Sequence, residues 1–382
     1  MKKNISILIY SLAAGGAERV VSILLKELSN KYNITLFLVN NTIFYDIPKS
    51  IKIIYLEKSN PDESGVKKFL KLPVLGWKYR KFIKKYNVFI SLSFMNRPNY
   101  INVFAKLFGS RSKTIISERI APFGEYGGLS FKDRINRLLI KFLYPKADII
   151  IPNSKLTGFE LNRFFNVLEE KIKIIYNPID LKKIENLKNK DIIIKKEKFT
   201  FVTVGRFERQ KNHMLLIDAF YKLNLDIEIW LIGDGHLRKK IEERILNLKL
   251  KEKIKLLGKQ KNPYKFLAKA DCFIFSSNYE GFPNVLLEAL ACNLPIISTD
   301  CISGPREILA PNSDFKKQTE NVEVVEYGVL VPVGDVDKMA QAMRMMIEND
   351  SLRKKLREKA YKRAKDFEVS KIIKEWEEVL SK

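Results

Sequence analysis

The chain has 382 residues, 46% of them apolar, and its formal net charge is +25. This length exceeds the usual size of one hydrophobic core, so we expect two domains, and no apolar run approaches the roughly 18 residues of a membrane span. Its 3 cysteines lack metal-type spacing and its histidines number 2, which leaves little material for a zinc site or a His-based triad and fits a reducing cytoplasm.

The amino-terminal segment reads as a strand followed by a helix. Ile5–Tyr10 is a short apolar run, and Ala17–Leu28 is an amphipathic helical pattern. Gly15 and Gly16 lie between them, where glycines let the backbone approach a ligand, although a plain tight turn explains the pair equally well. The segment also resembles a signal peptide, but the apolar run continues into the helical pattern, so we interpret it as part of a domain.

Strand-like runs alternate with helical patterns along the chain, which predicts an α/β protein with parallel sheets wrapped by helices. The predicted strands of the first half are Ile5–Tyr10, Ile34–Val39, Ile51–Leu56, Val88–Ser93, Thr114–Glu118, Ile149–Asn153 and Ile172–Asn177. Those of the second half are Thr200–Arg206, Ile227–Gly233, Ile254–Gly258, Cys272–Ser277, Pro295–Asp300 and Gly328–Pro332. A highly charged stretch separates the two sets, so we expect a first domain at 1–180, a linker at 181–199 and a second domain at 200–366.

Two segments of the first half combine cations with apolar side chains at helical spacing. Between Val66 and Tyr86 the chain has 8 Lys and Arg residues and no acidic residue, and Pro73 and Gly76 should kink the first half of this helix. Its predicted apolar stripe is Phe69, Leu72, Leu75, Tyr79, Phe82 and Tyr86. The second segment has a stripe of Phe131, Ile135, Leu138 and Phe142.

An anionic membrane surface is the partner that we favour for the segment from Val66 to Tyr86, because each cation near anionic lipid contributes about 1 kcal/mol. For the second segment, an ordinary helix with its apolar face in the core is an equally good alternative. Nucleic acid is the competing polyanion. We expect no such partner, because the chain has no zinc-finger spacing, no RNP-type aromatic motif and no helix-turn-helix signal.

Two cations flank the end of a predicted strand in the second half. The strand Thr200–Arg206 ends in Gly205 and Arg206, Lys211 follows five residues later, and a helical pattern comes directly after it. Ligands of open α/β sheets bind at the carboxyl ends of strands. A guanidinium fork with a lysine point charge suits a diphosphate, although solvated surface charges are the ordinary alternative.

Two carboxylates frame a predicted helix start in the segment EGFPNVLLE. Pro283 is expected at the first helical position, so the amides near Asn284 and Val285 would point out of a helix end that favours anions. Glu280 precedes that end and Glu288 lies about a turn inside, where each can accept hydrogen bonds from sugar hydroxyls. The alternative is an acidic first turn that only complements the helix dipole.

The pattern VGRxxxxKN followed by EGFPNVLLE resembles the retaining glycosyltransferases of family 4, which have the GT-B fold. The resemblance covers nearly the whole chain. It implies two Rossmann-like, doubly wound parallel-sheet domains facing across a cleft, with a last helix at 367–382 that crosses back to the first domain. It also implies that Arg206 and Lys211 bind the donor diphosphate, Glu280 the transferred sugar and Glu288 the ribose. The expected nucleotide-sugar contacts are completed by Gly15, Gly16, Gly258, Gly281, Phe282, Asn284 and Val285.

A closer resemblance concerns the acceptor. The stretches IYSLAAGGAERVVSILL, NRPNYIN, IKFLYPKADIIIPNS and NPYKFLAKA are similar to the N-acetylgalactosaminyltransferases of bacterial protein N-glycosylation. That group implies UDP-GalNAc as donor, an oligosaccharide on undecaprenyl diphosphate as acceptor, and a peripheral location on the cytoplasmic face of the plasma membrane. By the same analogy, the cations between Lys67 and Lys85 would hold the lipid diphosphate.

The resemblance also bears on mechanism, and the chain departs from it at one position. It implies a front-face substitution with retained configuration, in which a donor phosphate oxygen takes the acceptor proton. Many members have a histidine where ISERIAPF here places Arg119, and no histidine precedes His213, which excludes a mechanism that needs an imidazole in the first domain. No metal or other cofactor is expected. The one DxD pair, Asp335 with Asp337, precedes a helical pattern and suits helix capping.

The function predicted from the sequence is therefore transfer of a hexosamine, GalNAc by preference, to a lipid-diphosphate-linked glycan. A capsule or lipopolysaccharide glycosyltransferase with another nucleotide-sugar donor is the alternative, because EGFPNVLLE does not distinguish hydroxyl stereochemistry. A UDP-sugar epimerase on the same fold is a further alternative, and it would turn over UDP-GlcNAc without an acceptor.

Overall fold

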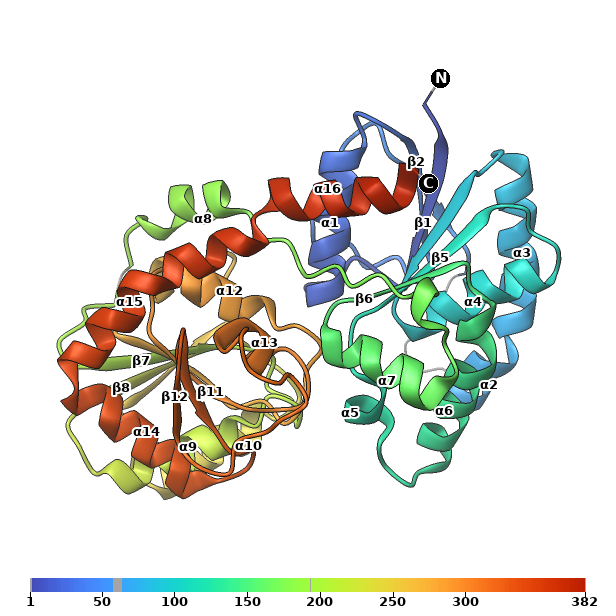
Figure 1. Cartoon of the computed structure of the whole chain (residues 1–382). Coiled ribbons are helices and arrows are strands. Elements are labelled where there is room, and N and C mark those ends of the chain that lie inside the picture. Colours follow the sequence, from blue (N-terminus) through green and yellow to red (C-terminus); the bar gives the residue numbers. More distant parts are fainter. Residues whose placement is uncertain (1, 58–63, 193, 382) are drawn as a thin grey trace. The chain divides into compact units, whose positions relative to one another are not determined.

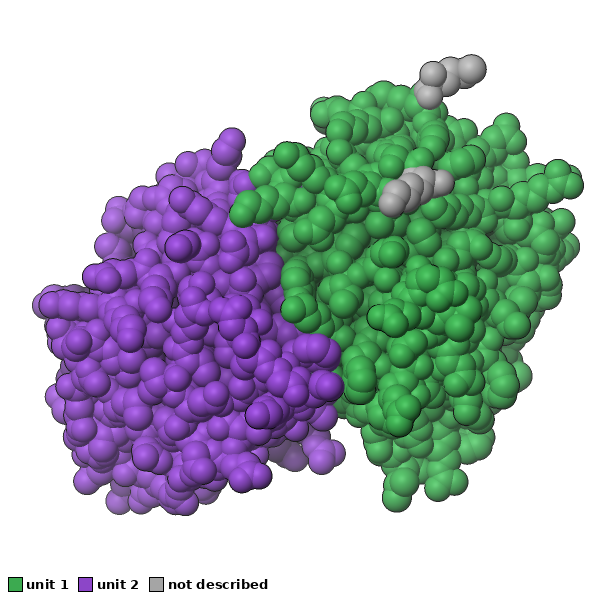
Figure 2. All heavy atoms as spheres, in the orientation of Figure 1, with its two compact units in different colours: residues 1–178, 370–382 green, residues 179–369 purple. Residues whose placement is uncertain are grey.

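The computed structural model describes residues 2–57, 64–192 and 194–381. Its contacts divide the chain into two compact units, coloured separately in Figure 2. Unit 1 consists of residues 1–178 and 370–382, and unit 2 is the continuous stretch 179–369. Unit 1 is therefore completed by the last residues of the chain.

Unit 1 is built on a parallel sheet of 6 strands in the order β3-β2-β1-β4-β5-β6. The strands are β1 Asn4–Ile9, β2 Asn33–Leu38, β3 Lys52–Tyr55, β4 Ile90–Phe94, β5 Lys113–Glu118 and β6 Ile149–Pro152. The first strand is central, with β2 and β4 as its parallel neighbours. Runs such as SILI and ISLSF are buried on both faces, which explains why they read as continuous apolar or small stretches.

Helices cover both faces of this sheet (Figure 1). They are α1 Gly16–Leu28, α2 Gly65–Leu70, α3 Leu72–Lys85, α4 Asn96–Leu107, α5 Pro122–Tyr126, α6 Phe131–Leu143, α7 Lys155–Phe165 and α16 Val369–Ser381, with 3-10 turns at Tyr144–Lys146 and Glu169–Lys171. Side chains of α3, α4, α6 and α7 share one core with Leu8, Phe37 and Ile116 of the sheet. The last helix packs through Trp376 against Phe94 of β4, with ring centroids 5.7 Å apart.

Unit 2 contains a sheet of 7 strands in the order β12-β13-β11-β10-β7-β8-β9. The strands are β7 Thr200–Val204, β8 Glu228–Ile232, β9 Ile254–Gly258, β10 Cys272–Phe275, β11 Ile296–Thr299, β12 Glu323–Val325 and β13 Gly328–Val331. All pairs are parallel except β12 with β13. The strand order reverses direction between β7 and β10, and ligands of such sheets bind at that switch point.

The helices of unit 2 again form layers on its sheet. They are α8 Leu181–Lys188, α9 His213–Leu223, α10 Arg238–Asn247, α11 Tyr264–Leu267, α12 Asn284–Ala291, α13 Pro305–Leu309, α14 Val336–Glu348 and α15 Asp350–Ala364, with a 3-10 turn at Lys365–Phe367. Side chains of α9, α10 and α14 share a core with Phe201, Ile229 and Ile297 of the sheet.

The observed elements differ from the sequence predictions in three places. The run 172–177 makes one isolated bridge, Ile150 with Ile172, because it lies at the edge of unit 1 without a further partner strand among the described residues. The first part of the expected linker is helix α8, whose Leu181 and Ile184 are buried, and Leu187 accepts a hydrogen bond from Asn262 of unit 2. Residue 193 of that stretch lies outside the described residues. The short edge strand β12 was not predicted.

The basic segment from Val66 to Tyr86 forms α2 and α3, and most of its predicted apolar stripe belongs to the core. Leu72, Leu75 and Tyr79 are at most 5% exposed and pack in unit 1. The helical segment is interrupted at Lys71, two residues before Pro73. Gly76 lies inside α3, where a Cβ would lie 2.4 Å from Phe104 Cβ, so glycine allows close packing of α3 on α4. The membrane interpretation is therefore wrong for these three side chains, whereas Phe69 of the same predicted stripe is 37% exposed.

A different set of apolar side chains is exposed on the same two helices. Val66, Leu70, Val74 and Trp77 are 64%, 67%, 65% and 49% exposed, and their spacing places them along one outer face. On α6, Phe131, Leu138 and Phe142 are 74%, 53% and 65% exposed. We call these seven residues the apolar face of unit 1. Within the described residues, no helix has the length and apolarity that crossing a membrane requires.

Candidate functional site

Lys211 and Glu280 form an ion pair where two neighbouring parallel strands of unit 2 end. Strand β7 continues into the loop 205–212, and β10 continues into the loop 276–283. Lys211 Nζ lies 2.5 Å from Glu280 Oε1, and the two side chains are 17% and 9% exposed. The structure thus brings together two of the residues that the sequence singled out, 69 positions apart in the chain. Their catalytic roles stay predictions.

Hydrogen bonds between the two loops fix the backbone that carries this pair. Ser276 Oγ donates to the Lys211 carbonyl at 2.7 Å. The Asn278 amide donates to the Gln210 carbonyl at 2.8 Å, and Gln210 Nε2 donates to the Tyr279 carbonyl at 2.9 Å. Sequence reasoning missed these polar side chains, although amides and hydroxyls in loops that follow buried strands are a recognisable signal of loop bracing.

Helix α12 begins one residue later than predicted. Its first residue is Asn284, and Pro283 is the N-cap with an extended ψ of 109°, so no side chain caps the first turn. The extended ψ explains the difference, because an N-cap residue has non-helical backbone angles. Asn284 and Val285 lie half-buried in the first turn, and Glu288 is 3% exposed in the middle of the helix. Phe282 is buried against Phe367, with centroids 5.3 Å apart, so its ring anchors the loop.

The segment after β11 supports the loop that carries Glu280. The Glu280 amide donates to the Ile302 carbonyl at 3.2 Å, and Ser303 Oγ donates to the Gly281 carbonyl at 2.7 Å. Gly304 has φ +93°, and a Cβ there would lie 2.5 Å from Pro283 Cδ. Glycine is required at this position for both its backbone angle and its close approach.

A buried arginine holds that supporting segment in place. Arg306 is 5% exposed, and its Nε and Nη2 donate to Asp300 Oδ2 at 3.0 and 2.5 Å. Its Nη2 also lies 2.7 Å from Glu323 Oε2. Burial raises the pKa of Asp300, while the Arg306 hydrogen bond and charge lower it. The arrangement ties the end of β11 to α13 and to β12.

Two glycines that follow β8, Gly233 and Gly235 in the sequence IGDG, lie beside the loop that carries Arg206. A Cβ at Gly233 would lie 1.9 Å from the Gly205 oxygen, and one at Gly235 would lie 2.6 Å from the Phe207 oxygen. Close backbone packing therefore explains the IGDG turn. Gly258, at the end of β9, has φ +63°, and a Cβ there would have nothing within 4 Å. Arg206 itself is 62% exposed and pairs with Glu208 at 3.2 Å.

His213, the first residue of α9, is a structural neighbour of this site. It is 3% exposed, and its ring meets Phe207 edge to face with centroids 4.9 Å apart. Burial, with a smaller contribution from the Lys211 charge, lowers the pKa of His213 to about 3. The imidazole is neutral at physiological pH, and its burial keeps it from acting as a base toward a bound substrate.

Unit 1 carries the remaining predicted glycines. Gly15 is the N-cap of α1, and Gly16 is its first residue. The Tyr45 hydroxyl donates to the Gly15 carbonyl at 3.1 Å, so this loop is braced by the segment after β2. Arg119 is 5% exposed at the end of β5, where it hydrogen-bonds Ser117 Oγ at 3.1 Å and Asn177. Burial lowers the pKa of Arg119 to about 9, partly offset by Glu118.

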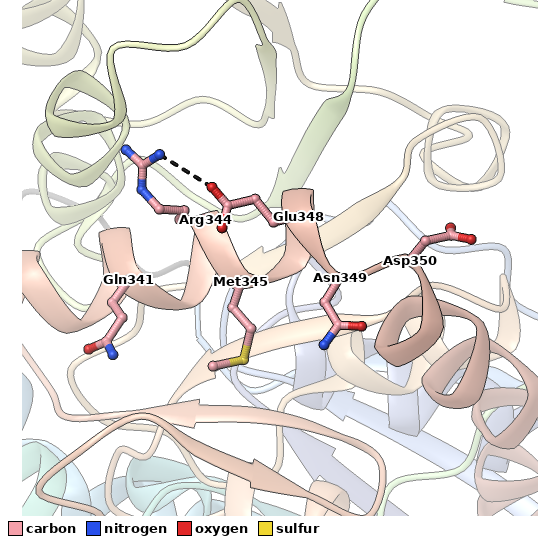
Figure 3. Close-up of a pocket in the computed structure, with 6 residues that line it drawn as sticks. All are labelled: Gln341, Arg344, Met345, Glu348, Asn349 and Asp350. Carbon is pink, nitrogen blue, oxygen red and sulfur yellow. Dashed lines mark hydrogen bonds and ion pairs between the residues drawn. The ribbon is translucent and has the colours of Figure 1, made fainter.

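One surface pocket lies away from the predicted site. Figure 3 shows its lining along the end of α14 and the start of α15, where Arg344 pairs with Glu348 at 3.5 Å. Arg344 also bonds the carbonyl of Leu223, the last residue of α9. Helix α9 begins beside Lys211, at the carboxyl ends of the strands, and runs to their amino ends. The pocket therefore lies at the amino ends of the strands.

The predicted capping role of Asp335 is confirmed, since its Oδ1 accepts the Lys338 amide at 2.9 Å.

Comparison with known proteins decides the family. The model of Glycosyltransferase Family 4 matches residues 14–183, and that of Glycosyl transferases group 1 matches residues 185–363. A Campylobacter jejuni protein named N-acetylgalactosamine-N,N'-diacetylbacillosaminyl-diphospho-undecaprenol 4-alpha-N-acetylgalactosaminyltransferase is 41% identical over 98% of each chain. The chain belongs to glycosyltransferase family 4.

Solved structures place this glycosyltransferase in the GT-B fold, as the sequence predicted. Anabaena HepE in complex with UDP is similar with a TM-score of 0.75 and 20% identity over 100% of both chains. Sucrose-phosphate synthase from Thermosynechococcus elongatus is similar with a TM-score of 0.82 and 17% identity, over 100% of this chain and 98% of that one. At such identities the likeness concerns the fold.

Proposed function

We propose that this glycosyltransferase moves GalNAc from UDP-GalNAc to an oligosaccharide carried on undecaprenyl diphosphate, with retention of the anomeric configuration. The proposal is supported by the Campylobacter jejuni relative, whose name states this sugar and this type of lipid carrier, and which is aligned over 98% of the chain. The retained configuration follows from the family 4 resemblance of the sequence.

The observation that carries the donor site is the Lys211–Glu280 pair at the carboxyl ends of β7 and β10. In the proposed complex Lys211 and the exposed Arg206 bind the diphosphate, and Glu280 accepts hydrogen bonds from the transferred sugar. Glu288, in the middle of α12, binds the ribose hydroxyls. The first turn of α12 faces the negative charge that grows on the diphosphate as the glycosidic bond breaks, and a helix N-terminus stabilises such charge.

The proposed reaction is a front-face substitution. The acceptor hydroxyl attacks the anomeric carbon on the face from which UDP leaves, and a phosphate oxygen of the donor takes the hydroxyl proton. This chemistry depends on positioning and on stabilising the leaving diphosphate more than on a protein base. It fits a unit 2 site in which the histidine nearest to Lys211, His213, is buried and neutral.

The test is an assay of the purified protein with a panel of UDP- and GDP-sugars and synthetic polyprenyl-diphosphate-linked glycans, with products read by mass spectrometry and anomeric NMR. We expect an added N-acetylhexosamine mass with UDP-GalNAc and an α linkage. Transfer from another donor would support a capsule or lipopolysaccharide glycosyltransferase instead. Conversion of UDP-GlcNAc without an acceptor would support an epimerase.

We further propose that unit 1 approaches an anionic bilayer through its apolar face. Of the large apolar side chains that are exposed among the described residues, 19 lie in unit 1 and 4 in unit 2, namely Tyr221, Leu246, Val324 and Val333. The units have equal numbers of residues, and 8 of the 19 side chains in unit 1 lie on α2, α3 and α6. Lysines surround it, and Lys81 Nζ lies 3.4 Å from the Trp77 ring centroid. Apolar side chains beside cations are typical of membrane-surface helices.

A further inference from the structure

We propose that Glu280 is an internal counter-ion that holds Lys211 until a donor diphosphate displaces it, so that diphosphate binding releases this carboxylate for the sugar. The inference rests on the proposed function, because it assigns an order of events to the same donor site. Its new element is that Glu280 and the donor diphosphate compete for Lys211, which the family resemblance does not imply.

The side chains of Lys211 and Glu280 are the parts of the site that can move, because hydrogen bonds hold the backbone of both residues. The backbone of Lys211 is held by Ser276, and the backbone of Glu280 is held by Ile302 at 3.2 Å. Lys211 Nζ is 2.5 Å from the carboxylate and lies 5.3 Å from the Phe275 ring centroid, so the cation is held between an acid and an aromatic ring. Both charges are largely removed from water, and breaking a buried pair without replacing a partner is unfavourable.

A diphosphate is such a replacement partner for Lys211. When its oxygens take the Lys211 ammonium, the Glu280 carboxylate loses its cation and needs hydrogen-bond donors, which the hydroxyls of a hexose supply. UDP without a sugar satisfies Lys211 but leaves Glu280 without those donors and next to a like charge. The pair therefore favours the intact nucleotide sugar over the UDP product, and the return of Glu280 to Lys211 promotes UDP release.

The test is calorimetric titration of UDP and of uridine into the full-length protein and its variants. Because Glu280→Gln removes the competing charge, we expect it to bind UDP about tenfold more tightly, a change of about 1.4 kcal/mol. Uridine has no phosphate, so its affinity should not change. Glu280→Asp keeps the charge and should bind UDP within about twofold of the unmodified protein. When Glu280→Gln is added to Lys211→Met, UDP should bind no more tightly than it binds to Lys211→Met alone.

The outcomes separate the inference from the proposed function. If the unmodified protein binds UDP and Glu280→Gln binds it equally or more weakly, the counter-ion role is wrong while the donor site stands. If the gain appears equally for uridine, the variant acts through general loosening of the site, and the inference is also wrong. If no uridine nucleotide or nucleotide sugar binds any folded variant, the proposed function itself fails. Circular dichroism of each variant verifies folding.

Discussion

At the scale of single residues, the Lys211–Glu280 pair is the most direct object for a test of activity. In the proposed complex, Lys211→Ala removes a cation from the leaving diphosphate, and Glu280→Gln weakens the acceptor of the sugar hydroxyls. Each should lower kcat/KM for transfer by about 100-fold or more, the effect of removing one preorganised electrostatic contact. Arg344→Ala is the matched control, because Arg344 lines the pocket at the amino ends of the strands, away from Lys211. This variant should keep full activity. Equal activity of all three variants would contradict the site.

Gly304 allows a test of the segment that supports Glu280. Alanine there combines an unfavourable φ of +93° with a contact of 2.5 Å to Pro283 Cδ. We expect Gly304→Ala to lower the free energy of unfolding by about 2 kcal/mol and to weaken UDP binding. Gly334 has φ +78° with nothing within 4 Å, so Gly334→Ala isolates the backbone effect. It should cost about 1 kcal/mol and leave UDP binding unchanged, as denaturant titration and calorimetry would measure.

Glu118 should make the stability of unit 1 fall as the pH rises. It is 2% exposed, its Oε2 accepts the Tyr144 hydroxyl at 2.5 Å, and burial raises its pKa to about 7 from 4.5. The folded state thus favours the protonated acid. Its stabilising contribution is fully present below about pH 4.5, falls as the pH rises, and is lost above about pH 7.

The variant Glu118→Gln removes this titration. We expect its stability to fall less between pH 5 and 8 than that of the unmodified protein, by at most about 3 kcal/mol. Some dependence remains, because burial also raises the pKa of Glu160 to about 7. Denaturant midpoints across that pH range would measure it, and Glu170→Gln, at an exposed position, is the control. An unchanged slope in Glu118→Gln would contradict the assignment.

At the scale of elements, α6 offers a clean test of bilayer contact. Its side chains Phe131, Leu138 and Phe142 are exposed, so replacing all three with serine should preserve the fold and remove apolar area from the proposed membrane contact. We expect at least about tenfold weaker binding to vesicles that contain anionic lipid, since each buried side chain contributes about 1.5 kcal/mol or more. Co-sedimentation would measure it. Tyr221→Ser with Leu246→Ser, exposed in unit 2, should bind vesicles normally.

The elements also show what could be predicted from the sequence. Apart from the run 172–177, the predicted strands match the observed ones within one or two residues, because buried parallel strands are continuous apolar stretches. Periodicity along α3 was recognised, but it cannot state whether Leu75 and Tyr79 face a core or a bilayer. That choice depends on α4, against which Gly76 packs. The part of the apolar face from Val66 to Trp77 was not recognised in the sequence, because the buried stripe on the same helices is the stronger pattern.

The candidate site was predicted in part. Arg206, Lys211, Glu280 and Glu288 were named from local motifs, because each motif joins a strand end to a helix start. The direct contact of Lys211 with Glu280 could not be read from either motif, since it requires the pairing of β7 with β10. The role of Ser303 and Gly304 was missed for the same reason, because they act on a loop about 20 residues earlier in the chain.

At the scale of the whole molecule, unit 1 depends on a helix that follows unit 2 in the chain. Trp376 is 0% exposed, and its removal would leave a cavity beside Phe94. We expect Trp376→Ala to destabilise unit 1 by about 3–5 kcal/mol. Unit 2 should keep its stability and its UDP binding, so that unfolding separates into two transitions. Hydrogen exchange would resolve them, and equal loss of protection in both units would contradict this independence.

The position of α16 after unit 2 also matters during synthesis. Unit 2 is one continuous stretch, so it can complete its core as soon as it leaves the ribosome. Residues 1–178 of unit 1 leave the ribosome first, but the hydrophobic surface around Phe94 stays uncovered until α16 with Trp376 has been synthesised. We therefore expect a stage of synthesis in which unit 2 is folded while unit 1 is incomplete and exposes apolar surface, the condition that chaperones recognise.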